Sequence, residues 1–286
     1  MRAATRGQGS SAPTTPDRAE LAALLVRTCI AGPVPTDRSS NINNLRRLAA
    51  RDQLYTFGVD TDPAWDEDSL LALMAERVGI SPNPSYESGQ DHIDVDLTVR
   101  ALERYADVIR EAVDDRAPFL FASGHPAALA WIHAPVARAV RHAGARVLRL
   151  EDALGDSLLR YGRSPVVDGP EPGEVRQVED VVVRYRDGNL LHTHYPHYME
   201  ATLDVFASAG IRPGIVVADH GMAAAAGRRG VRTIGIADSN DPALFVAEAQ
   251  GSIEVVVPMD DGMPPALLDP VTDFILARAG LVDPSR

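Results

Sequence analysis

Side chains that can do chemistry gather at four places between residues 123 and 261, each shortly after an apolar run. They are histidine, aspartate, asparagine and serine, which can transfer protons, hold a divalent cation or hydrogen-bond an anion. The four places are Ser123-Gly124-His125, Asp219-His220-Gly221, Asp238-Ser239-Asn240-Asp241 and Asp260-Asp261. Because ligands of open α/β sheets bind beyond the carboxyl ends of the strands, we expect one shared site. Helix capping is the alternative; it suits Ser123 and Asp241 but explains His125 and His220 poorly.

A histidine-rich segment lies at 191–200. On a strand, His192 and His194 would share a face and could chelate one ion. His197 and Glu200 are one helical turn apart, a second spacing that can place two ligands together. Imidazole with carboxylate suits zinc, manganese, iron or nickel. Two alternatives stay open: phosphate binding by protonated imidazoles, and a solvated hairpin end.

Glycines stand at two of the expected strand-to-helix turns. At Ser123-Gly124 and at Gly221 they would let the free N–H groups of a helix start approach a bound anion. A close packing contact between strand and helix would also require small residues there. Neither turn has the spacing of a dinucleotide-binding fingerprint, so we do not expect a dinucleotide site.

The composition narrows the function further. All 28 basic residues are arginine, which excludes Schiff-base enzymes, P-loop NTPases and protein kinases, all of which need a lysine. The net charge of −12 argues against a nucleic-acid partner, and no apolar stretch approaches the length of a membrane span. We expect a cytoplasmic protein; homo-oligomerisation is left open. Cys29 lies in an apolar run, typical of a packed thiol.

The remaining pattern predicts the elements that position these residues. Residues 1–16 are expected to form a disordered tail, and residues 17–117 a helical N-terminal cap or subdomain with helices at 17–30, 41–52, 66–78 and 96–113. From 118 to 286, apolar runs alternate with helices, which predicts an α/β core: a three-layer, doubly wound, Rossmann-like and mostly parallel sheet. Its strands are expected at 119–122, 144–150, 214–218, 232–237 and 253–257. A β-hairpin at 181–194 is expected as an insertion, and 165–179 as a surface excursion.

Five segments together resemble a family of bacterial proteins known simply as phosphatases. They are 122–126, 192–201, 216–221, 236–242 and 257–261, and a weaker likeness extends into the helical first third. The resemblance implies a hydrolase that cleaves a phosphate ester.

We therefore expect a metal-assisted phosphatase that acts on a phosphate monoester of a small phosphorylated metabolite. The catalytic residues would be Asp219 or His220 as base or nucleophile, with His125 as the acid. A divalent metal ion would be held by some of His192, His194, Asp238, Asp241 and Asp260. The phosphate would contact Ser123, Gly124, Gly221 and Asn240. Two alternatives are a non-catalytic binding module for a phosphorylated metabolite or nucleotide, and a sugar-nucleotide transferase.

Overall fold

The computed structural model describes residues 17–155 and 164–286, so the expected tail at 1–16 lies outside the described residues. Its centre is an eight-stranded sheet in the order β10-β9-β8-β3-β6-β5-β4, with β7 paired to β6. Five neighbouring strands of this sheet are parallel: β10 (Val255–Pro258), β9 (Arg232–Ala237), β8 (Ile215–Asp219), β3 (Phe119–Ser123) and β6 (Val181–Arg186). Strands β10, β8 and β3 are buried along their whole length, because both faces are covered and their sequences are continuously apolar. The predicted α/β class is confirmed.

The other three strands extend the sheet in the antiparallel sense. β6 and β7 (Asn189–Leu191) form the predicted hairpin. The segment expected to be a surface excursion instead forms β4 (Val166–Val167) and β5 (Gly173–Val178), paired next to β6. Its prolines and glycines hid these strands, which lie at the edge of the sheet, where prolines are tolerated.

The prediction of a strand at 144–150 was wrong. Only a single parallel bridge joins Val147 to Phe119, and the chain then enters α7 (Leu150–Leu154). The reason is that β3 pairs with β8 through one edge and with β6 through the other. Little of β3 is left for a further partner.

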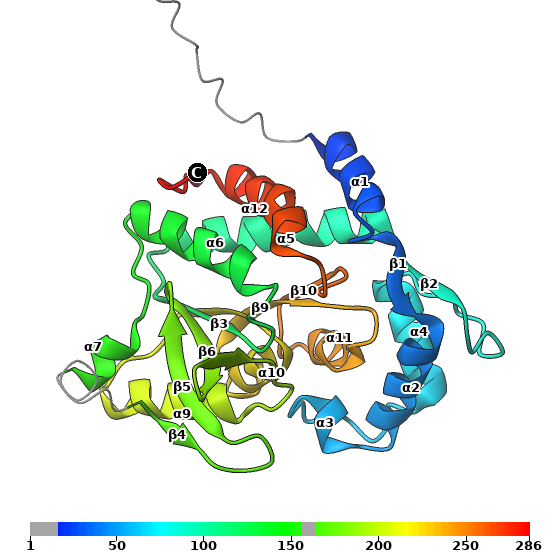
Figure 1. Cartoon of the computed structure of the whole chain (residues 1–286), viewed down its shortest axis with the longest axis horizontal. Helices are drawn as coiled ribbons and strands as arrows, with labels where there is room; N and C mark the ends of the chain where they lie inside the picture. Colours follow the sequence, from blue (N-terminus) through cyan, green and yellow to red (C-terminus); the bar gives the residue numbers. More distant parts are fainter. Residues whose placement is uncertain (1–16, 156–163) are drawn as a thin grey trace, which may run out of the picture.

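Helices cover both faces of the sheet (Figure 1). One layer holds α5 (Val95–Asp114), α6 (Ala130–His142) and α12 (Pro265–Ala279), and the other holds α9 (His197–Ser208), α10 (His220–Arg228) and α11 (Pro242–Ala249). The sequence placed α5 in the N-terminal helical segment, yet α5 packs on β10 and α12. One continuous apolar core therefore joins the first third to the rest.

The first third also contains a small sheet that the sequence did not predict. β1 (Gly32–Asp37) and β2 (Gln90–Ile93) pair antiparallel, between α1 (Arg18–Arg27) and the helices α2 (Arg38–Ala49), α3 (Gln53–Thr56) and α4 (Glu67–Arg77). β1 contains two prolines, which are unfavourable inside a strand, and no strand was predicted there. All four of these helices, and α5 after them, begin after an aspartate whose side chain accepts a backbone N–H bond.

Candidate active site

A polar cavity of about 310 Å³ lies at the carboxyl ends of the parallel strands. It brings together eight of the residues that the sequence singled out: His125, His192, His194, His220, Asp238, Asn240, Asp241 and Asp260. Asp261, Gly262, Thr36 and Asn44 complete the lining. The remaining four predicted residues, Ser123, Gly124, Asp219 and Gly221, lie behind this surface. The shared edge of the sheet is therefore where the fold gathers these side chains.

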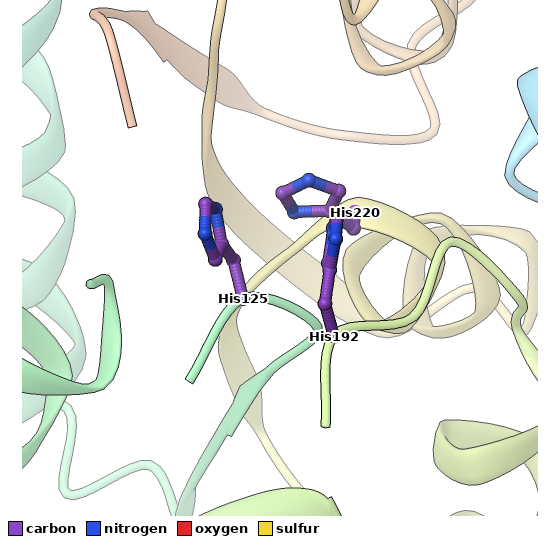
Figure 2. A group of neighbouring side chains, drawn as sticks. All are labelled: His125, His192 and His220. Atoms are coloured by element: carbon purple, nitrogen blue, oxygen red, sulfur yellow. The ribbon is translucent and has the colours of Figure 1, made fainter. Parts of the chain in front are cut away.

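Three histidines from separate segments converge in the cavity (Figure 2). His125 follows β3, His192 follows β7, and His220 is the first residue of α10. A nitrogen of each lies within 4.8 Å of the others, and His194, His220 and Asp241 form a second such group. The expectation that His192 and His194 lie on a strand was wrong, because β7 ends at Leu191; their rings still meet, with centroids 4.7 Å apart.

Backbone contacts fix this histidine segment. The Thr193 amide donates to the Gly124 carbonyl at 2.8 Å, and the buried Arg184 guanidinium donates to the His192 carbonyl at 2.9 Å. Phe57, which follows α3, packs its ring 4.6 Å from that of His194. The segment after β7 is thus held between the large sheet and the N-terminal third.

Asp219 occupies the centre of the layer beneath the cavity and has no exposed surface. Its Oδ1 accepts from the amides of Gly124 at 2.7 Å and His125 at 3.0 Å, and lies 2.9 Å from Nδ1 of His220. Its Oδ2 lies 3.1 Å from Nε2 of His133, a buried residue of α6. Both oxygens are thus occupied by protein donors. This geometry favours an orienting role for Asp219 over nucleophilic attack.

The glycine turns pack closely against other parts of the chain. The Gly124 amide, expected to meet phosphate, donates to the protein's own Asp219. A Cβ on Gly221 would lie 2.2 Å from the His194 carbonyl oxygen. Ser123 is buried, and its hydroxyl accepts from the His125 amide. Gly124 and Gly221 are thus closely packed against residues 193–195, and whether any of the three positions contacts phosphate stays a prediction.

The opposite wall of the cavity is acidic. Thr36, at the end of β1, donates to Oδ2 of Asp238 at 2.5 Å and lies 3.4 Å from Oδ2 of Asp260. Asp261 faces Nδ1 of His125 at 3.4 Å and Nε2 of His220 at 3.6 Å. Four buried carboxylates, those of Asp238, Asp241, Asp260 and Asp261, thus surround one small space.

Several residues of the site were not among those singled out from the sequence. Thr36 and Asn44 come from the N-terminal third, where no motif marks them. His133 carries no motif either, because only the orientation of α6 brings it to Asp219. Asp261 was noted beside Asp260 but not chosen. Outside the cavity, His197 pairs with Glu200 at 3.1 Å.

Comparison with known proteins gives one family. The model of a family described as Phosphatase matches residues 16–283. The chain belongs to this family. A protein from Streptomyces coelicolor named simply as a phosphatase is 43% identical over 272 residues, which cover 94% of this chain and 98% of the relative. The resemblance inferred from the five sequence segments is confirmed.

The donor set of this phosphatase fits a divalent cation. His220 presents Nδ1 to the Asp219 carboxylate, the arrangement that usually orients a metal-binding imidazole and leaves Nε2 free for the ion. That Nε2 lies 3.4 Å from Asp241 Oδ2. Nδ1 of His194 and Oδ2 of Asp261 are buried without a hydrogen-bond partner. Imidazole nitrogens and carboxylate oxygens are ligands that zinc and related metals accept.

The histidines of the cavity differ in their protonation. Desolvation and the proximity of His220 lower the pKa of His192 to about 4 and that of His194 to about 3, so both rings are neutral near pH 7. Burial lowers the pKa of His220, but Asp241, Asp219 and Asp261 outweigh it and raise that pKa to about 10. Burial and neighbouring carboxylates raise the pKa of Asp238. The carboxylates that stabilise the proton on His220 would also attract a metal cation, which would take the place of that proton.

Among the described residues, no helix is long and apolar enough to cross a membrane.

Proposed function

We propose that this phosphatase hydrolyses a phosphate monoester of a small molecule with the help of a divalent metal ion. The observation that carries the proposal is the lining of the cavity: four imidazoles, four carboxylates and, within the described part of the chain, no arginine. The four carboxylates would repel a phosphate dianion placed in this cavity. The sequence contains no lysine, and the turn amide of Gly124 is taken by Asp219. Imidazolium and a metal ion are the remaining sources of positive charge.

The ligand set that we favour is His194, His220 and Asp241. It includes an anionic ligand, and Asp219 orients His220 from behind. When bound, such an ion offsets the charge of the phosphoryl oxygens and lowers the pKa of a water molecule. Asp238 and Asp260 lie on the same wall and are candidates for further ligands.

His125 remains the best candidate for the acid. Its Nδ1 faces Asp261, and its ring lies at the half-exposed side of the cavity, where a leaving group can depart. It would hold the proton that the leaving oxygen takes. Asn240 also lines the cavity, and its amide nitrogen donates to the Ser40 hydroxyl at 3.1 Å. The cavity volume lies at the small end of the range for ligand sites, which favours a small substrate head group.

The test is turnover of p-nitrophenyl phosphate by the purified protein, with metal analysis before and after chelation. We expect bound metal, loss of turnover with chelator, and recovery when a divalent metal is restored. His220→Ala should lower turnover by at least ~100-fold. His142→Ala, an exposed histidine in the last turn of α6, is the matched control and should leave turnover unchanged. A protein that holds no metal and hydrolyses no phosphoester would refute the proposal.

A further inference from the structure

An apolar groove of about 480 Å³ lies beside the cavity, between α6 and the strands β5, β6 and β7. Its lining includes three large apolar side chains that are exposed to solvent: Trp131 at 59%, Leu190 at 44% and Val178 at 43%. Exposed apolar side chains gathered in one groove usually mark a binding surface. The groove arises because α6 covers β3 and part of β6 on this face.

The groove begins where the cavity ends. Pro126 lines the groove and directly follows His125; Leu190 lines it and precedes His192 by two residues. The rings of His125 and His192 stack with centroids 4.7 Å apart. The stretch of chain after β3 and the stretch from Leu190 to His192 therefore each contribute to both the cavity and one end of the groove.

The other end of the groove is closed by a neutralised ion cluster. Arg138, in the last turns of α6, pairs with Asp283 at 3.0 Å and with Glu179. From Ala130 to Arg138 the helix rises about 12 Å, at ~1.5 Å per residue. Between its two ends the groove offers proline, alanine, tryptophan, valine and leucine side chains, with no unpaired charge among the lining residues described.

We propose that this groove binds the apolar part of the leaving group, so that the preferred substrates are phosphate monoesters of aliphatic or aromatic alcohols. The inference rests on the proposed function, in which His125 protonates the leaving oxygen next to Pro126. A leaving group released at His125 would extend along α6 over Trp131 and bury apolar surface there. Polar leaving groups would gain nothing from these side chains.

The first experiment compares hexyl phosphate with ethyl phosphate as substrates of the full chain. We expect kcat/KM for hexyl phosphate to be at least ~10-fold higher, since four more methylenes are buried. Val178→Ser, at the end of the groove remote from the histidines, should lower kcat/KM for hexyl phosphate ~3-fold or more and leave ethyl phosphate unchanged. Val26→Ser is the matched control, because Val26 is also 43% exposed and lies outside the groove. Equal kcat/KM for the two esters, or an equal effect of both variants, would overturn the proposal.

The second experiment separates the groove from the chemistry. The chain has two tryptophans, so Trp65→Phe leaves Trp131 as the single reporter of fluorescence. Titration with hexylphosphonate, which cannot be hydrolysed as an ester, should give a saturable change that ethylphosphonate does not give. Saturation without turnover of any ester would support the groove and refute the phosphatase mechanism; turnover without saturation would do the reverse. A dimer in solution that dissociates on Trp131→Ala would assign the groove to a second copy of the chain and overturn the proposal.

Discussion

Substitutions of Asp219 should affect the stability of the fold and the affinity of the site for metal in different ways. It is fully buried and meets four nitrogen donors: two backbone amides and two imidazoles. Asp219→Ala removes all four acceptor contacts. The imidazoles of His133 and His220 can change tautomer, but the amides of Gly124 and His125 cannot. The His125 amide keeps the Ser123 hydroxyl as an acceptor, so only the Gly124 amide is left without a partner, and the free energy of unfolding should fall by about 1–3 kcal/mol.

Asp219→Asn should behave differently. Its amide oxygen can still accept from both backbone amides and from His220, and its NH2 group can donate to Nε2 of His133, whose Nδ1 has no partner. The fold should persist, while the loss of the negative charge behind His220 lowers metal affinity by ~10–100-fold.

The assays are urea unfolding followed by circular dichroism, and metal titration of the folded variants. Asp114→Ala, at the exposed end of α5, is the control and should change neither property. If the free energy of unfolding of the alanine variant lay within ~1 kcal/mol of that of the wild type, the contacts of Asp219 would not stabilise the fold as inferred. An asparagine variant with unchanged metal affinity would refute the orienting role.

Three further substitutions test contacts around the site. Gly221→Ala should displace His194, because the added Cβ would lie 2.2 Å from its carbonyl oxygen; crystallography would show the shift, and an undisturbed His194 would contradict the packing described. Thr36→Val removes the hydroxyl that joins β1 to Asp238 and should lower the free energy of unfolding in urea by about 1.5–3 kcal/mol. An unchanged unfolding midpoint would contradict a stabilising role for this hydrogen bond. Arg38→Met leaves the buried Asp91 carboxylate without its guanidinium at 3.0 Å; we expect about 3–5 kcal/mol of destabilisation, and a loss below ~1 kcal/mol would contradict it.

Much of the parallel core could be predicted from the sequence, because its signals are local. A mainly apolar run bounded by polar residues predicts β9, and its bounds match the prediction. Apolar residues at helical spacing predict α12. Polar residues placed after such runs must meet at one edge of the sheet. For this reason the sequence could predict one shared site for His125, His220, Asp241 and Asp260.

The failures have non-local causes. The segment at 144–150 has a strand-like composition, but the sheet had no free edge for it beside β3. Thr36 and His133 carry no motif; each reaches the site only because β1 or α6 is packed in a particular orientation. The glycines at the turns were ambiguous, since close packing and anion binding require the same small residue.

The hydroxyl of Thr36 reaches across 202 residues of sequence to Asp238 and 224 to Asp260. Closing so long a loop is slow, and it comes after the local helices have formed. During synthesis, every other residue that lines the cavity, apart from Gly262, precedes the Asp260-Asp261 pair that follows β10. A growing or truncated chain that stops before β10 therefore carries the histidines without their full acidic wall. Recovery of turnover during refolding should for this reason lag behind recovery of helical circular dichroism, and would report the moment at which the first and last strands of the described chain come together.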